Sequence, residues 1–136
     1  MTSSADATLP EATTPYEMIG GDDAVRRLVA RFYRLMDELP EAAACRAIHP
    51  ESLADSEQKL YEFLSGWLGG PPLFVERRGA PMLRRRHLHA PIGPDERDGW
   101  MLCFRRALVE TVEDEALRGF LLERIEALAN HMQNRP

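Results

Sequence analysis

Hydrophobic residues recur at helical spacing along most of this chain. Between Asp22 and about Glu38 the apolar positions lie three or four residues apart, which predicts an amphipathic helix with one buried face. That face carries Val25, Leu28, Val29, Phe32 and Met36. Tyr33 follows Val29 by four residues, so its side chain is predicted on the same side, where a buried hydroxyl needs a hydrogen-bond partner.

A second helical pattern follows a short turn of helix over Ala42–Arg46 and the corner Ile48-His49-Pro50. Ser52 and Asp55 resemble a capping box, which predicts that the next helix begins there. The residues on its predicted inner face are Ser56, Leu60, Phe63, Leu64 and Trp67. Gly69-Gly70-Pro71-Pro72 predicts its end, because glycine favours the cap of a helix and proline cannot continue one.

The C-terminal half predicts two more helices. Residues 69–80 are expected to form a loop, and the segment that contains His87 follows it. Gly93-Pro94-Asp95 predicts the start of a helix with an inner face of Trp100, Cys103, Phe104, Ala107 and Leu108. A last helix is predicted from about Asp114. The residues on its predicted inner face are Leu117, Phe120, Leu121, Ile125, Leu128 and Met132. No segment alternates with the period of a β-strand, so the predicted fold class is all-α.

Length and charge narrow the class of protein. A chain of 136 residues fits one domain, and its net charge of −5 disfavours nucleic-acid binding. Cys45 and Cys103 form no C-x-x-C pair, which indicates reduced thiols in a cytoplasmic protein. No apolar run approaches the roughly 18 residues of a membrane span, and the start has no secretory signal, so we expect no integral membrane association. The small, polar residues 1–14 predict a disordered tail before a domain over 15–134.

The segment from Gly79 to Ile92 is the most informative for function. In it His87 follows three consecutive arginines and lies between two prolines. In a small helical protein such a histidine is a candidate axial metal ligand, and Tyr33, His49 and Trp100 would add polar groups to the interior. The alternatives are an exposed loop histidine, ordinary core packing of Tyr33 and Trp100, and a surface turn at His49.

Several motifs together resemble the group II truncated haemoglobins, which are shortened globins built as a two-over-two helical sandwich. The similarity covers roughly residues 15–134, and its most diagnostic features are the glycine-glycine-proline loop, the Arg86-His87 pair and Trp100 thirteen residues later. The motifs that carry it are Tyr16-Glu-Met-Ile-Gly20-Gly21, Arg31-Phe32-Tyr33, Phe63-Leu-Ser-Gly-Trp-Leu-Gly69-Gly70-Pro71-Pro72, Arg86-His87, Trp100-Met-Leu-Cys103 and His131-Met132.

The resemblance implies a haem b cofactor (iron protoporphyrin IX) and a role for each matching residue. His87 would bind the iron through Nε2, while Tyr33, His49 and Trp100 would surround the ligand on the distal side. Lys59 and Arg86 match positions that reach the haem propionates. Without ligand, His49 or Tyr33 could itself bind the iron. The remaining residues of the implied haem pocket are Ser56, Leu60, Phe63, Leu64 and Met82.

The same resemblance implies reversible binding of dioxygen, nitric oxide and carbon monoxide. Bound dioxygen carries partial negative charge, and each hydrogen bond to it is worth roughly 1–3 kcal/mol, so two or three donors predict slow release. Slow release suits chemistry of oxygen with nitric oxide, or of peroxide, better than bulk oxygen transport. That chemistry would need an unidentified reductase as partner. The protein itself is expected to be a monomer or a homodimer. The alternatives are a haem-based redox or gas sensor that acts through a partner, and a helical binding module without a cofactor.

Overall fold

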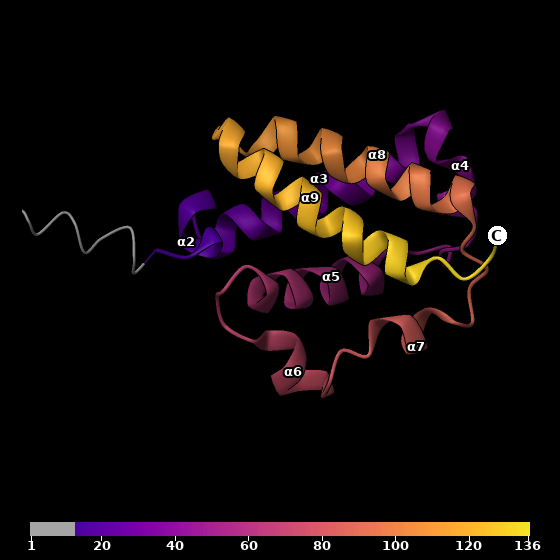
Figure 1. Cartoon of the computed structure of the whole chain (residues 1–136), viewed down its shortest axis with the longest axis horizontal. Coiled ribbons are helices and arrows are strands. Elements are labelled where there is room, and N and C mark those ends of the chain that lie inside the picture. The colour runs from indigo at the N-terminus through magenta and orange to yellow at the C-terminus, as the bar shows by residue number, and fades with distance from the viewer. Residues whose placement is uncertain (1–12) are drawn as a thin grey trace, which may run out of the picture.

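The computed structural model describes residues 13–136, and every regular element in that range is a helix (Figure 1). The predicted all-α class is therefore confirmed. A disordered tail is predicted for residues 1–14, of which residues 1–12 lie outside the described part of the chain. Thr14 caps the first described helix. The elements are α2 (Pro15–Ile19), α3 (Asp22–Glu38), η1 (Pro40–Ala42), α4 (Ala43–Ala47), α5 (Ala54–Trp67), α6 (Leu73–Arg78), α7 (Leu83–His87), α8 (Pro94–Thr111) and α9 (Glu115–Met132).

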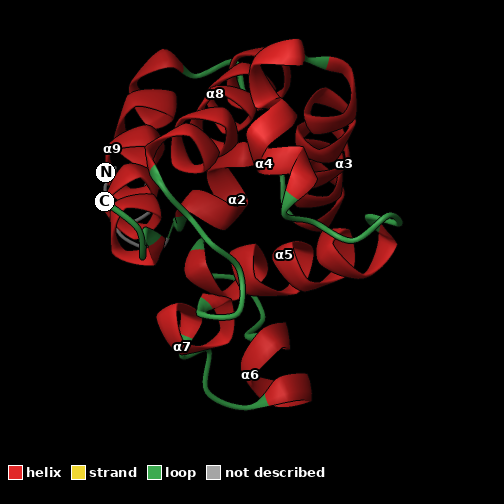
Figure 2. Ribbon diagram, turned by 90° about the vertical axis from the view of Figure 1, so that its right-hand side faces the viewer, coloured by secondary structure: helices red, strands yellow, loops and turns green. Residues whose placement is uncertain are grey.

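Four long helices form two packed pairs. Helix α3 packs against α5 and α8, and α8 packs in turn against α9, which gives the expected two-over-two sandwich. Figure 2 shows α5 between this upper group and the short helices α6 and α7. The two pairs meet around Phe32, whose ring makes edge contacts with the rings of Tyr33, Trp100 and Phe104. A single hydrophobic core is thus common to all four helices.

The structure corrects two predicted features around α5. Ser52 and Asp55 form no capping box: the helix starts after Leu53, the Ser52 hydroxyl accepts a hydrogen bond from the Ala54 amide, and Asp55 pairs with Lys59. Residues 69–80 are not all loop, because α6 forms within them. Six residues are too few to show a helical period, and α6 is stabilised by its packing on α5 rather than by its own sequence.

The inner face predicted for α9 is right at its centre and wrong at one position. Leu117, Leu121 and Ile125 are buried, but Phe120 is 44% exposed. The buried stripe advances by four residues at each step, so Phe120 lies roughly 100° around the helix from Leu121 and outside the contact with the core.

The glycine loop after α5 is explained by one side chain. The ring of Tyr16 lies directly against Gly70, where any Cβ atom would overlap it, and the Tyr16 amide donates to the Leu68 carbonyl at 2.9 Å. Tyr16 and Gly70 therefore fit only as a pair, which ties α2 to the end of α5 across more than fifty residues of sequence.

Within residues 13–136, no helix combines the length and the apolar character that crossing a lipid bilayer requires.

The one buried carboxylate of the described chain joins α5 to α6. Glu62 is 2% exposed and accepts hydrogen bonds from Arg78, Arg77 and Gln58, the shortest at 2.6 Å from Arg78. The Arg78 guanidinium, followed by the hydrogen bonds from Gln58 and Arg77, lowers the pKa of Glu62 to about 2. The hydrogen bonds from Arg77 and Arg78 thus hold α6 on α5, and the low pKa keeps Glu62 charged throughout the physiological pH range.

We predict that Glu62→Gln lowers the free energy of unfolding by roughly 1–3 kcal/mol at pH 7, because charged hydrogen bonds to arginine are lost. A folded pKa below the ordinary value near 4.5 stabilises the native state above pH 5 and ceases to do so as the pH falls towards 2. Urea unfolding between pH 3 and 7 should therefore show a flatter pH dependence in the variant. Glu126→Gln, at an exposed position of α9, is the control; parallel curves for Glu62→Gln and wild type would contradict the prediction.

Candidate functional site

His87 ends the five-residue helix α7, and its ring orientation is fixed by the backbone. Its Nδ1 lies 2.7 Å from the carbonyl oxygen of Leu83, one helical turn earlier. Since a carbonyl can only accept, neutral His87 carries its proton on Nδ1, and Nε2 keeps its lone pair free. A histidine that binds a metal through Nε2 commonly donates its other ring N–H in this way. The arrangement fits an axial ligand.

Two polar groups of the long helices open onto space near the aromatic cluster. The side chains of Tyr33 on α3 and Trp100 on α8 form no hydrogen bond within residues 13–136. In the same range, every polar side-chain atom that is fully enclosed has a hydrogen-bond partner. Both the hydroxyl and the indole N–H therefore border accessible space. The Trp100 ring is held parallel to Phe104 at 5.4 Å, and burial raises the pKa of Tyr33, so both remain donors at neutral pH.

His49 lies in the corner after α4 and approaches Tyr33, with ring centroids 6.1 Å apart. Its Nδ1 is 2.9 Å from the Cys45 carbonyl, so neutral His49 offers Nε2 as an acceptor and not as the donor that the sequence suggested. Burial of the ring is the main cause that lowers the pKa of His49, and the charge of Arg46 acts in the same direction, against the hydrogen bond to Cys45.

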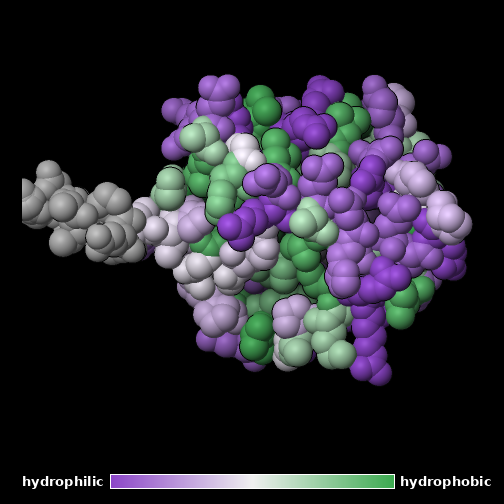
Figure 3. Space-filling model, viewed as in Figure 1, coloured by the Kyte–Doolittle hydropathy of each residue, from purple (hydrophilic) through white to green (hydrophobic). Residues whose placement is uncertain are grey.

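The face of α5 between these groups is only half covered by protein. Ser56, Leu60 and Phe63 lie on consecutive turns and are each half-buried, whereas Leu64 is fully buried in the core. Helix α7 packs on α9 and forms no close pair with α5, while Met82 and Leu88, at either end of α7, are about half exposed. Hydrophobic residues also reach the surface in the lower middle of the face in Figure 3. These apolar surfaces fit a flat apolar group bound between α5 and α7.

The two predicted propionate partners are engaged elsewhere in this structure. Lys59 forms an ion pair with Asp55 at 2.9 Å. Arg86 donates to the carbonyl oxygens of Arg78 and Ala80, both at 3.0 Å, and lies over the Phe74 ring. The sequence did not reveal that Arg86 links α7 to α6, because α6 itself was expected to be loop. Both side chains are exposed at their ends and long enough to reorient.

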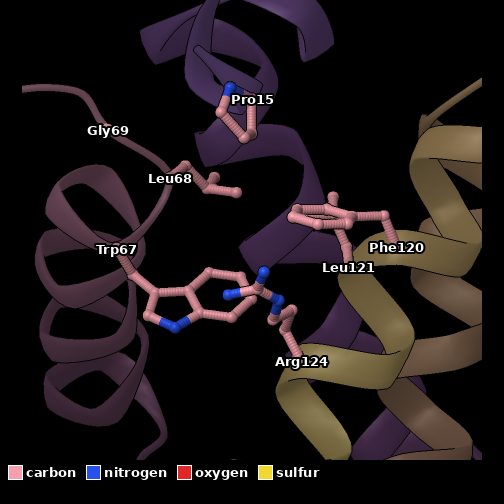
Figure 4. Close-up of a pocket in the computed structure, with 7 residues that line it drawn as sticks. All are labelled: Pro15, Trp67, Leu68, Gly69, Phe120, Leu121 and Arg124. Atoms are coloured by element: carbon pink, nitrogen blue, oxygen red, sulfur yellow. The ribbon is translucent and has the colours of Figure 1, made fainter.

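A separate groove of about 270 Å³ lies at the far end of α5 (Figure 4). Trp67 of α5 and Arg124 of α9 point toward one another across it, and Arg124 stacks on Phe120. None of the predicted site residues lines this groove. We place the site beside His87 instead, because the groove offers neither a metal ligand nor a polar group aimed inward from α3 or α8.

The two cysteines are structural. Cys45 and Cys103 are both buried and free. Burial raises the pKa of Cys45 to about 12 and that of Cys103 to about 11, so neither thiol ionises near neutral pH. Their place in the core leaves the histidines as the reactive groups of the site.

Comparison with known proteins agrees with this fold. A family model described as bacterial-like globin matches residues 14–134. The group 2 truncated hemoglobin YjbI of Bacillus subtilis (strain 168) is 38% identical over 120 residues, 88% of each chain. The solved group II 2-on-2 hemoglobin of Agrobacterium tumefaciens is 57% identical, with complete coverage of both chains and a TM-score of 0.91. The truncated oxygen-avid haemoglobin of Bacillus subtilis is 38% identical, with a TM-score of 0.81 over 90% of this chain and 100% of that one.

The chain therefore belongs to the bacterial-like globin family, among the group II truncated haemoglobins. This is a globin family that binds oxygen, and membership implies haem binding. The resemblance found in the sequence motifs is thus confirmed over the whole domain.

We predict that His49 carries its proton on Nδ1 and titrates at lower pH than the imidazole of an unstructured peptide. The hydrogen bond to the Cys45 carbonyl sets the tautomer, and burial of the ring lowers the pKa of His49 although that hydrogen bond by itself raises it. Nitrogen-15 NMR of the carbon monoxide form, which is diamagnetic, reports both the tautomer and the titration. A proton on Nε2 at neutral pH would contradict the geometry.

Proposed function

We propose that this protein holds haem b through Nε2 of His87 and binds dioxygen and other diatomic ligands on the opposite side. The observation that carries the proposal is the hydrogen bond from Nδ1 of His87 to the Leu83 carbonyl, which leaves Nε2 as a preformed ligand. Haem would supply a ferrous iron able to bind dioxygen, nitric oxide or carbon monoxide. Ser56, Leu60 and Phe63 would contact one face of the porphyrin, and Met82 the side of α7.

The distal side chains would retain a bound ligand. The Tyr33 hydroxyl and the Trp100 indole N–H both border open space and have no competing protein acceptor among the described residues. They are available to donate to dioxygen, whereas neutral His49 offers only an acceptor at Nε2 and would not itself donate to the ligand. Leu60 and Phe32 would keep the pocket largely apolar, which strengthens both hydrogen bonds.

Two donors in an apolar pocket imply slow oxygen release, which suits redox chemistry rather than bulk transport. The most direct candidate is the conversion of dioxygen and nitric oxide to nitrate, with electrons returned by a separate reductase. Mixing the oxygenated protein with nitric oxide in a stopped-flow instrument tests this. Rapid formation of one nitrate per oxygen bound supports the reaction, and release of dioxygen without nitrate would reject it.

We expect His87→Gly to lose stable haem binding, because it removes the Nε2 that the hydrogen bond to Leu83 leaves free as a ligand. The purified variant should lack the intense Soret absorption of the wild type after equal haem supplementation. Added imidazole should restore part of the absorption by entering the space left by the side chain. Glu126→Gly, at an exposed position of α9, should keep its colour; unchanged haem uptake by His87→Gly would end the proposal.

Trp100→Phe should accelerate oxygen dissociation by roughly tenfold or more, since it removes one hydrogen bond but keeps an aromatic ring against Phe104. Stopped-flow displacement of oxygen by carbon monoxide gives the rate. Trp67→Phe is the matched control, because Trp67 lines the separate groove of Figure 4. An oxygen off-rate equal to that of wild type would remove Trp100 from the distal hydrogen bonds.

A further inference from the structure

The last residues of the chain return to the segment around His87. Figure 1 shows the C-terminus beside the connection between α7 and α8. Residues 131–135, which we call the C-terminal strap, contact this connection through both backbone and side chains. We propose that the strap positions the His87 imidazole, with Asn134 as its central positioning residue. This inference rests on the proposed role of His87 as the iron ligand.

Both polar atoms of the Asn134 side chain form hydrogen bonds with His87, at the end of α7, or with the segment that follows it. Its Nδ2 donates to the carbonyl of Ala90 at 3.0 Å and to that of His87 itself at 3.4 Å. Its Oδ1 accepts from the Ile92 amide at 2.9 Å. The backbone amides of Asn134 and Arg135 both donate to the Ile92 carbonyl, at 2.9 and 3.0 Å. The turn after His87 is therefore held at three residues, His87, Ala90 and Ile92, by one asparagine and its neighbour.

Arg84 makes the same connection from within α7. Its Nη1 donates to the carbonyl oxygens of His131 and Gln133, at 2.6 and 2.9 Å. These carbonyls lie at the C-terminal end of α9, where backbone acceptors have no partner inside the helix and positive charge is favoured. Of the three consecutive arginines, Arg84 thus binds the strap and Arg86 binds the end of α6. Helix α7 is fixed from two sides.

This external support decides the position of His87 because α7 has little stability of its own. The helix has five residues, none of them buried, and an isolated helix of that length does not persist in water. Its first residue follows Met82, whose φ of 41° is rare outside glycine, so the backbone there is also strained. Contacts from the strap must therefore hold the Leu83 carbonyl and the His87 ring in register.

Groups that orient a ligating histidine affect the metal as well as the fold. Their loss commonly weakens metal binding by 10- to 100-fold. We expect Asn134→Ala to speed haem loss by roughly tenfold and to shift or broaden the iron–histidine stretching band of the ferrous, ligand-free protein. Asn134→Asp keeps the acceptor for Ile92 but replaces both donors, so it should shift the band at least as much. Amide hydrogen exchange in residues 84–92 should become faster in both variants.

The test compares these variants with the wild type by resonance Raman spectroscopy, haem transfer to an acceptor apoprotein and hydrogen exchange. Asn130→Ala is the matched control, because the Asn130 side chain, in the last turn of α9, accepts from Arg97 of α8 and forms no hydrogen bond with the connection between α7 and α8. If Asn134→Ala fails to fold by circular dichroism, Arg84→Gln supplies a second route, since it frees the same strap without changing Asn134. The band and the rates should respond in that variant too.

The outcomes separate this inference from the proposed function. A wild type without an iron–histidine band refutes the role of His87 and the strap with it. A wild type with the band, together with folded Asn134 and Arg84 variants of unchanged frequency and haem retention, overturns the strap alone. Faster hydrogen exchange with an unchanged band would show that the strap only stabilises the segment, which also contradicts a positioning role.

Discussion

The hydrogen bond between Nδ1 of His87 and the Leu83 carbonyl is the interaction on which the site depends. It fixes the tautomer, directs the free lone pair of Nε2 away from the helix backbone, and does so within one turn of a helix only five residues long. A bond of this kind requires that the turn itself be rigid. The structure provides the rigidity from outside the turn, through Arg84 on one side and Arg86 on the other.

On the opposite side of the site, helix packing places the polar groups, instead of a hydrogen bond to the backbone. Tyr33 and Trp100 are placed by long helices that share a fully packed core, so their polar groups are preorganised without hydrogen bonds to protein. His49 is placed by a corner, and its tautomer is set by the Cys45 carbonyl. In the proposed function, a ligand fixed by the backbone on one side and donors fixed by packing on the other would separate attachment of the cofactor from control of the bound gas.

Much of this arrangement was predictable from the sequence because long amphipathic helices reveal themselves by their period. The bounds of α3 match the prediction, and Tyr33 and Cys103 are buried where the pattern places them. The prediction failed where an element is too short to show a period, as at α6, or where a stripe is narrow, as at Phe120. The start of α5 failed for another reason: Ser52 and Asp55 have the residue types of a capping box, but Asp55 pairs with Lys59 instead.

The sequence by itself determined the all-α class, the four long helices and the identity of the imidazole at position 87, because period and motif are local properties of the chain. Only the tertiary structure decided which nitrogen of His49 and of His87 carries the proton, that Arg86 turns to α6, and that Asn134 closes on the residues after His87. The histidine and Arg86 contacts span four to eight residues and depend on how short segments fold, whereas the Asn134 contacts join residues 42 to 47 positions apart. Their partners are brought together by the packing of whole helices, and no local pattern encodes that distance.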